Sequence, residues 1–332
     1  MNLLFAKFKS KNLCFKNRLV MPPMATSKCP DGKINQSLLD YYDEKSKGGY
    51  IGLIITEHSY VSPEGKASSA QVSIASDDAI EGFKKLCDVI HQNGSKIFAQ
   101  ISHAGMMAKE ETTGFKAIAP SSIENPKRTE LPIPEEMTKK QIELIKQNFI
   151  QAAVRVKKAG CDGVEIHSAH GYLLNQFYSP LSNYRTDEYG GTLENRIRLH
   201  LEIIEGIRKE LGPDYPIALR LGACDYTDHG STIDDAVKAA KLFEKAGVDL
   251  LDISGGFNGY IIPNVNHEGY FSNVTETIKQ AVNIPVICTG GILDPEIAET
   301  LLKDNKADLI GVGRAILKDS LWPKTAFEAL SR

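Results

Sequence analysis

Two histidines and a tyrosine stand close together in the stretch Glu165 to Tyr172, which has the sequence E-I-H-S-A-H-G-Y. Imidazoles exchange protons near neutral pH, whereas a phenol stays protonated there and can donate its proton. If their tips converge, His167, His170 and Tyr172 can hold a substrate oxygen and deliver a proton beside it. An isolated H-x-x-H pair more often consists of side chains that only satisfy local hydrogen bonds, so the rest of the chain must decide.

The residues before this cluster predict a strand that positions it. In 162–167 apolar and polar side chains alternate, so Val164 and Ile166 share one face while Glu165 and His167 share the other. His167 is therefore expected at the end of a strand, with the other two side chains in the turn that follows. Loops at the carboxyl ends of parallel strands are where α/β folds place chemistry.

Seven further stretches have the same strand character, and helical patterns separate them. Repeated strand and helix units over this length predict an α/β fold, a single-domain (β/α)₈ TIM barrel spanning residues 1–332. The predicted strands are 18–21, 51–58, 96–102, 162–167, 216–221, 249–254, 284–289 and 308–312, and the clearest helices are 36–47, 77–92, 138–160, 194–211 and 234–246. Residues 104–136, which contain four prolines, break the pattern and are expected to form a lid-like insertion after the third strand.

Composition excludes several classes of protein. The 332 residues are 42% hydrophobic and 24% charged, with no apolar run of the length that a membrane helix needs. A net charge of −3 with interspersed signs argues against a nucleic-acid-binding surface. The six cysteines form no C-x-x-C pair and the first residues show no export signal, so we expect a cytoplasmic protein with reduced thiols. The oligomeric state stays open, and a homo-oligomer is possible.

Two polar side chains are expected to point into the barrel. Alternation turns Gln100 inward on the third strand and Arg220 inward on the fifth. A buried charge needs a partner, and one possibility is an internal pair between Glu165 and Arg220 that only fills the barrel. The other is a ligand-binding arginine, and both can hold at once.

Glycines follow the last two predicted strands. Gly290 and Gly291 come after the seventh strand, and Gly313 precedes Arg314 after the eighth. Such glycines often form only tight turns, but loops at this place in a barrel commonly bind phosphate through backbone N–H groups. The G-x-G-x-x-G pattern of a dinucleotide-binding fold does not follow the first strand.

With these residues, the whole chain resembles the Old Yellow Enzyme family of FMN-dependent ene-reductases. The His167 and His170 pair resembles its bacterial branch and the flavin barrels of enoate and dienoyl-CoA reductases. Those larger relatives carry a cysteine cluster and further domains; because this chain stops shortly after the eighth helix, electrons are expected directly from NADH or NADPH. The matching segments are 17–24, Gln100 with 103–105, 165–172, 179–183, 185–191, 194–196 and 311–314.

The resemblance implies a reaction and a role for each site residue. Reduced FMN would pass a hydride to the β-carbon of an enone or enoate, while Tyr172 protonates the α-carbon and the two histidines hold the carbonyl oxygen. Gln100 and Arg220 would face the flavin pyrimidine. The phosphate would lie against Gly290, Gly291, Gly313 and Arg314.

The chain departs from the family beside the flavin. Pro23 and Met24 are followed by Ala25, where family members usually carry Thr or Cys as a hydrogen-bond donor. His58 ends the second strand where the family tends to have Gly or Ala, and alternation with Thr56 turns it inward, although it could also bond a neighbouring loop.

Two other classes of function remain possible. A metal-dependent barrel hydrolase would use His167 and His170 as ligands, with His58 and Asp252 as the plausible additions. A flavin-binding protein without catalytic activity is the second alternative. The resemblance predicts no metal site.

Overall fold

The computed structural model describes residues 2–331 and contains a closed parallel barrel. Each strand pairs with the next, and the last strand returns to pair with the first, so the predicted TIM barrel is confirmed. The eight predicted stretches supply these strands, although the ordered ladders are shorter. The barrel strands are β3 Leu19–Met21, β4 Leu53–Ile55, β6 Lys96–Ser102, β9 Gly163–Ser168, β10 Ile217–Gly222, β11 Leu250–Ser254, β12 Val286–Cys288 and β13 Leu309–Gly311.

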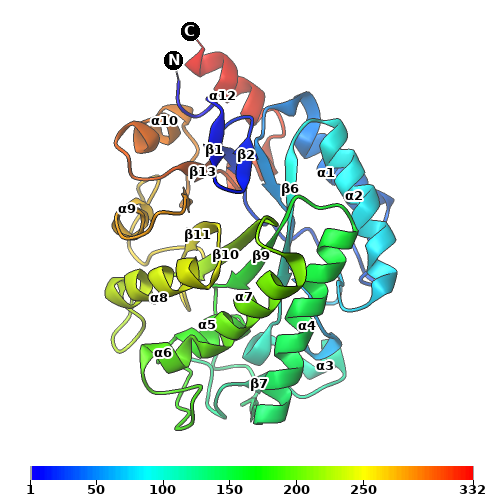
Figure 1. Ribbon diagram of the computed structural model, residues 1–332, viewed down its shortest axis with the longest axis vertical. Helices are drawn as coiled ribbons and strands as arrows, with labels where there is room; N and C mark the ends of the chain where they lie inside the picture. The colour runs from blue at the N-terminus through cyan, green and yellow to red at the C-terminus, as the bar shows by residue number, and fades with distance from the viewer. Residues whose placement is uncertain (1, 332) are drawn as a thin grey trace.

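Helices surround the strands, as Figure 1 shows. A capping box begins α4, with Thr138 and Gln141 bonding each other's backbone, and it places the start of this helix where the sequence predicted it. The helix predicted over 194–211 is interrupted at Ile197, which separates α6 from α7. The helices are α1 Gln36–Ser46, α2 Ile80–Gln92, α3 Glu110–Thr113, α4 Lys139–Lys158, α5 Leu173–Tyr178, α6 Leu193–Arg196, α7 Arg198–Leu211, α8 Ile233–Ala246, α9 Ser272–Lys279, α10 Pro295–Lys303, α11 Arg314–Lys318 and α12 Trp322–Leu330.

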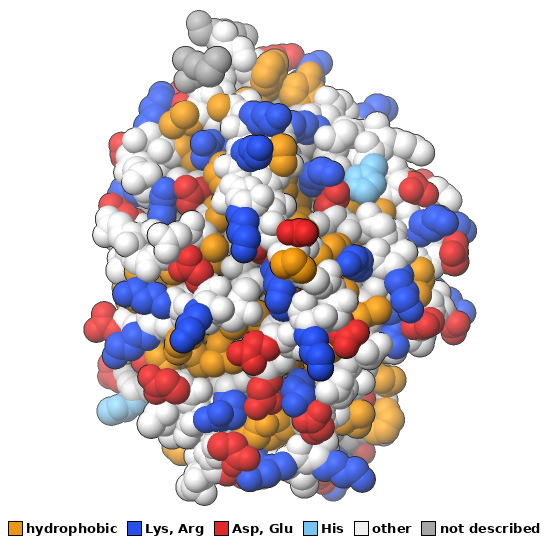
Figure 2. Space-filling model, viewed as in Figure 1, with side chains coloured by type: hydrophobic (Ala, Val, Ile, Leu, Met, Phe, Trp, Pro, Cys, Tyr) orange, Lys and Arg blue, Asp and Glu red, His pale blue; other side chains and the backbone are white. Residues whose placement is uncertain are grey.

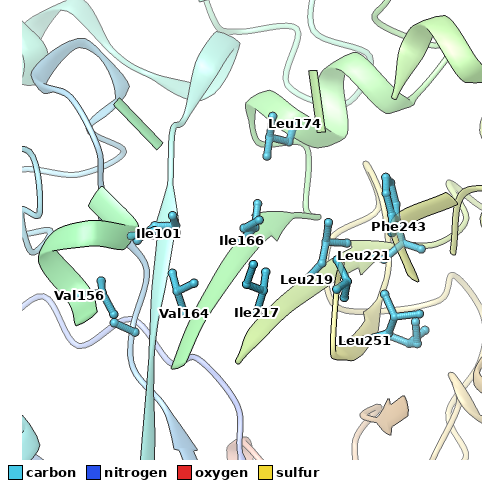
Figure 3. Close-up of a cluster of buried hydrophobic side chains, with 14 of the residues drawn as sticks. Ile101, Val156, Val164, Ile166, Leu174, Ile217, Leu219, Leu221, Phe243 and Leu251 are labelled. Atoms are coloured by element: carbon cyan, nitrogen blue, oxygen red, sulfur yellow. The ribbon is translucent and has the colours of Figure 1, made fainter. Parts of the chain in front are cut away.

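Strand alternation divides the core into two layers. Apolar side chains on the outer face of the barrel pack against the helices. Figure 3 shows Val164 and Ile166 of β9 in one cluster with Val156 of α4 and Leu174 of α5. The inner face holds a separate cluster, which includes Phe98 and Ala218. The period of two therefore fixes which side chains reach the barrel interior, as the sequence predicted.

A hairpin that the sequence analysis missed closes one end of the barrel. Strands β1 (Phe8–Ser10) and β2 (Leu13–Phe15) pair antiparallel before the first barrel strand. Phe8 and Phe15 stack, and the Phe15 ring meets that of Phe98 inside the barrel. Because their apolar side chains join the inner cluster, they seal the amino end and leave the carboxyl end for a ligand.

The insertion after β6 lies at the opposite end from this hairpin (Figure 1). It contains the 3₁₀ helix η4 (Gly105–Met107), α3 and the short strands β7 (Ile118–Ala119) and β8 (Glu135–Glu136), so it is more structured than its sequence indicated. Met106 and Ala119 pack with Phe257, which follows β11. The insertion thus borders the carboxyl end of the barrel, and its action as a lid stays a prediction.

The distribution of charge on the surface and the apolarity of the helices agree with what the composition predicted. Figure 2 shows Lys and Arg mixed with Asp and Glu over the visible face, without a basic stripe. Among residues 2–331, no helix is both long and apolar enough to cross a membrane.

Candidate active site

Three polar aromatic side chains meet where β9 ends. The ring centre of His167 lies 4.9 Å from that of Tyr172 and 5.3 Å from that of His170. Two consecutive residues with positive φ, His170 at 60° and Gly171 at 72°, turn the chain back over the barrel mouth. Gly171 N donates to Asn175 Oδ1 at 2.7 Å, which pins this turn to α5. The predicted convergence is therefore present.

Burial holds these groups in their neutral forms. Desolvation lowers the pKa of His167 and of His170 well below the usual value, and the nearby Arg220 charge acts in the same direction. Burial also raises the pKa of Tyr172 to about 12. At neutral pH the cluster is two uncharged imidazoles and an uncharged phenol, so it can donate hydrogen bonds and a proton without carrying charge.

Two further residues contact His170 and were not expected from the sequence. His170 Nε2 lies 2.7 Å from Ser254 Oγ at the end of β11. The Tyr260 ring, in the loop after β11, is centred 6.3 Å from the His170 ring and is 63% exposed. Alternation with Asp252 would have turned Ser254 inward, whereas nothing in the sequence pattern indicated Tyr260.

The barrel interior below the cluster holds a layer of polar side chains. Gln100 Nε2 donates to Glu165 Oε1 at 2.7 Å, which is the inward partner that Gln100 required. Arg220 Nε lies 3.3 Å from Asp252 Oδ2, and these two residues pair in register on β10 and β11. One of the two possibilities for Arg220, an ion pair with Glu165, is therefore not found within residues 2–331: the carboxylate level with Arg220 comes from β11.

Burial and the neighbouring Asp252 charge raise the pKa of Glu165 well above its usual value. Burial likewise raises the pKa of Asp252 to about 6, although Arg220 opposes this shift. Arg220 Nε and both Asp252 oxygens make no hydrogen bond within residues 2–331. Arg220 therefore keeps donor capacity for a ligand above it.

His58 lies at the same mouth, after β4. Its ring is centred 5.3 Å from Tyr172 and 6.2 Å from His167, so it faces inward as predicted. Its Nδ1 is also 2.8 Å from Nε2 of Gln71, so the alternative contact with a neighbouring loop is present too. Burial, followed by the Arg220 charge, lowers the pKa of His58 to about 4.

The segment after β3 borders His58 on the next strand. Ala25 is exposed, and the backbone N–H of Thr26 donates to Glu57 Oε2 at 2.6 Å. The Thr26 amide is thus already engaged, while Thr26 Oγ1 is buried without a hydrogen-bond partner in residues 2–331. Pro23 and Met24 are partly buried. Met24 packs closely against Gly313, because a Cβ added to that glycine would lie 2.9 Å from Met24 Sδ.

The glycine loops after β12 and β13 lie side by side. A Cβ on Gly291 would come within 3.0 Å of Arg314 Nη2, and both Gly290 and Gly291 have positive φ. Arg314 is exposed, and its Nη2 donates to Tyr270 Oη at 3.1 Å. The backbone N–H groups of these loops and the exposed guanidinium of Arg314 together form an arrangement that fits an anionic group.

The described residues do not form a metal centre. Among residues 2–331, no group of three or more His, Cys, Asp or Glu side chains is arranged to hold a metal ion. His58 and Asp252 therefore do not complete a ligand set with His167 and His170.

A parallel barrel with glycine loops after its last two strands and a polar aromatic cluster at its carboxyl end has the arrangement of a TIM-barrel enzyme that binds a phosphate-bearing ligand. Residues 3–332 match the NADH:flavin oxidoreductase / NADH oxidase family. The chain belongs to this family of enzymes, the Old Yellow Enzyme family.

Individual relatives agree with this assignment. Over 330 residues the chain is 40% identical to the NADPH dehydrogenase of Bacillus subtilis (strain 168), covering 99% of this chain and 95% of that protein. It is 42% identical over 332 residues to an NADH oxidase of Thermoanaerobacter brockii, covering 98% of this chain but only 50% of the relative. The structure of the old yellow enzyme homologue from Zymomonas mobilis superposes with a TM-score of 0.85 at 26% identity, covering 98% of this chain and 92% of that one.

Proposed function

We propose that this chain uses FMN and NADH or NADPH to reduce the activated C=C bond of α,β-unsaturated carbonyl compounds. The convergence of His167, His170 and Tyr172 at the carboxyl end of the barrel carries this proposal. Reduced FMN supplies the hydride when it is bound. The residues of the chain must then orient the alkene, stabilise negative charge on its carbonyl oxygen and provide a proton.

The two histidines are assigned to the carbonyl oxygen. Both imidazoles are neutral at physiological pH, so each offers an N–H donor rather than a positive charge. Donors fixed by the fold stabilise enolate charge as it develops and cost no reorganisation during the reaction. His170 is held by its contact with Ser254, and His167 by its place on β9.

Tyr172 is assigned to the α-carbon as the proton donor. Its hydroxyl makes no hydrogen bond with residues 2–331, and its raised pKa keeps it protonated over the whole physiological range. The side chain is partly buried beside His167, and water has restricted access there. A phenol in this position can transfer its proton to carbon while the histidines hold the oxygen.

The remaining predicted residues fit FMN. Arg220 Nε is buried without a hydrogen-bond partner in residues 2–331, so it can bond the polar edge of a flavin together with Gln100. The phosphate fits the cradle of Gly290, Gly291, Gly313 and Arg314, where side chains would leave no room. Pro23, Met24, Ala25 and His58 border the same opening from the ends of β3 and β4.

A spectrophotometric screen tests the proposal. The purified protein should be yellow, NADH or NADPH should bleach it, and one or more of a panel of enones and enoates should restore the colour. The same screen identifies the preferred nucleotide and alkene class. Bleaching without recovery by any compound in the panel would contradict alkene reduction, and a yellow protein that neither nucleotide bleaches would be the non-catalytic flavin binder.

A further inference from the structure

His58 has a fixed hydrogen-bonding environment on one side of its ring. Gln71 is 4% exposed, and its Oε1 accepts from Ala67 N at 2.6 Å. Its Nε2 donates to the carbonyl oxygen of His58 at 3.1 Å. A backbone N–H can only donate and a carbonyl can only accept, so these two contacts fix the orientation of the Gln71 amide.

The amide orientation determines the tautomer of His58. The group that lies 2.8 Å from His58 Nδ1 is the NH₂ of Gln71, which can only donate, so Nδ1 is the acceptor. The Ser102 hydroxyl, whose Oγ lies 3.4 Å from the same nitrogen, can also donate to it. Because the pKa of His58 is lowered to about 4, the ring is neutral at physiological pH and carries its single proton on Nε2. The hydrogen-bond contacts of the ring within residues 2–331 are all made by Nδ1, so this Nε2–H makes none there, and the ring is partly exposed at the barrel mouth.

The His58 ring adjoins that of Tyr172. Their ring centres are 5.3 Å apart and their planes are inclined by 58°, a separation at which the polar tips of two such rings can meet. Tyr172 is the group that would become negatively charged during the proposed reaction. In a site this buried, an unpaired phenolate is costly, and a nearby N–H donor offsets part of that cost.

We propose that His58 is a positioning residue that donates its Nε2–H to the Tyr172 oxygen as Tyr172 gives up its proton. In that step the O–H bond breaks, a C–H bond forms at the α-carbon and the bonding electron pair remains on the phenolate oxygen. A proton from solvent then restores the phenol. Gln71 supports this role from behind the ring because it keeps Nε2 protonated. The inference rests on the proposed function, in which Tyr172 is the proton donor.

A double-mutant cycle tests the coupling between the two residues. The rate of alkene reduction by the reduced enzyme is measured for His58→Phe, which keeps a ring but lacks the N–H, alone and combined with Tyr172→Phe. We expect His58→Phe to slow this half-reaction about tenfold and to increase its solvent deuterium isotope effect, because a charge-assisted hydrogen bond is lost. In the Tyr172→Phe background the same substitution should have no further effect. His58→Gln, which keeps an N–H donor, should recover part of the rate.

The outcomes separate this inference from the proposed function. An unchanged rate in Tyr172→Phe alone would overturn the proposed function. A slow Tyr172→Phe enzyme in which His58→Phe still reduces the rate by the same factor would overturn the role of His58 only.

A measurement without turnover checks the tautomer. In the nitrogen NMR spectrum of protein labelled at histidine, the His58 signals, assigned by their loss in His58→Phe, should show a protonated Nε2 and an unprotonated Nδ1. Gln71→Leu should change this pattern and slow the proton-dependent half-reaction. A protonated Nδ1 in the unsubstituted protein would contradict the proposal.

Discussion

Arg220 and Asp252 occupy the same level of neighbouring strands, and Arg220 Nε lies 3.3 Å from Asp252 Oδ2 inside the barrel. Asp252 is fully buried and Arg220 is 5% exposed, so removal of the carboxylate leaves a buried cation without its partner. Asp252→Asn should lower the free energy of unfolding by about 3 kcal/mol in urea titrations at neutral pH. Unchanged stability would show that Glu165 pairs with Arg220 in place of Asp252.

Arg314 should contribute to cofactor retention. Its guanidinium lies beside the cradle of Gly290 and Gly291, where it can form charge-assisted bonds to a phosphate. Such bonds contribute about 1.5–3 kcal/mol, so Arg314→Ala should weaken FMN binding roughly ten- to a hundredfold in fluorescence titrations of the flavin-free protein. The control is Lys324→Ala, which removes the same charge from an exposed position on α12. Equal FMN affinities for the two variants would show that Arg314 does not contribute to the phosphate site.

Ala25 offers a test of the segment after β3. It supplies no side-chain donor, and the neighbouring Thr26 amide is already bonded to Glu57. Ala25→Thr introduces a hydroxyl that can donate a hydrogen bond to the flavin. If this bond stabilises the reduced flavin by ~0.5–1.5 kcal/mol, the two-electron midpoint potential should rise by roughly 10–30 mV. Ala25→Val, of similar shape without the hydroxyl, should leave it unchanged. If the potential of the Thr variant is the same or lower, Ala25 does not border the flavin or another donor already serves it.

Buried histidines should make the protein sensitive to acid. His200 bonds Ser168 Oγ at 2.8 Å, and burial lowers its pKa to about 3. Because the pKa of His200 is lower in the folded protein, the unfolded chain takes up the proton at a higher pH than the folded protein does. The free energy of unfolding is therefore unaffected by His200 above the unfolded pKa of about 6.5, and it decreases as the pH falls below that value. Each such histidine adds a slope of about 1.4 kcal/mol per pH unit in this range.

His200→Gln should therefore flatten the dependence of unfolding free energy on pH between about pH 6 and pH 5, relative to the unsubstituted protein. Urea titrations across this range measure both slopes. The raised pKa values of Asp252 and Glu165 act in the opposite direction, but they are common to both proteins. Parallel slopes would show that His200 does not titrate on unfolding.

Local sequence patterns predicted the barrel and the direction of its inner side chains. Period-two alternation placed Gln100, His167 and Arg220 on the inner face, because side-chain direction in a strand depends only on its own residues. The partner of Arg220 depends on the register between two strands, which the pattern of one strand does not contain. The sequence therefore suggested Glu165, whereas the structure pairs Arg220 with Asp252.

The sequence analysis missed features that leave no regular pattern of apolar and polar residues. Strands β1 and β2 have three residues each, too few for alternation to distinguish them from a loop. The break at Ile197 does not interrupt the apolar spacing of its helix. Gln71 lies far from His58 in sequence, and only the folded loop reveals the contact that fixes the imidazole tautomer.

The half-reactions of Tyr172→Phe test the central claim most directly. In the proposed function Tyr172 provides a proton only to the alkene. Reduction of the bound flavin by NADH or NADPH should therefore keep its rate, while reoxidation by an enone should slow by about a hundredfold, within the range that general acids contribute. Stopped-flow absorbance of the flavin separates the two steps. Equal enone-dependent reoxidation rates in Tyr172→Phe and the unsubstituted protein would contradict the assignment of Tyr172 as the proton donor.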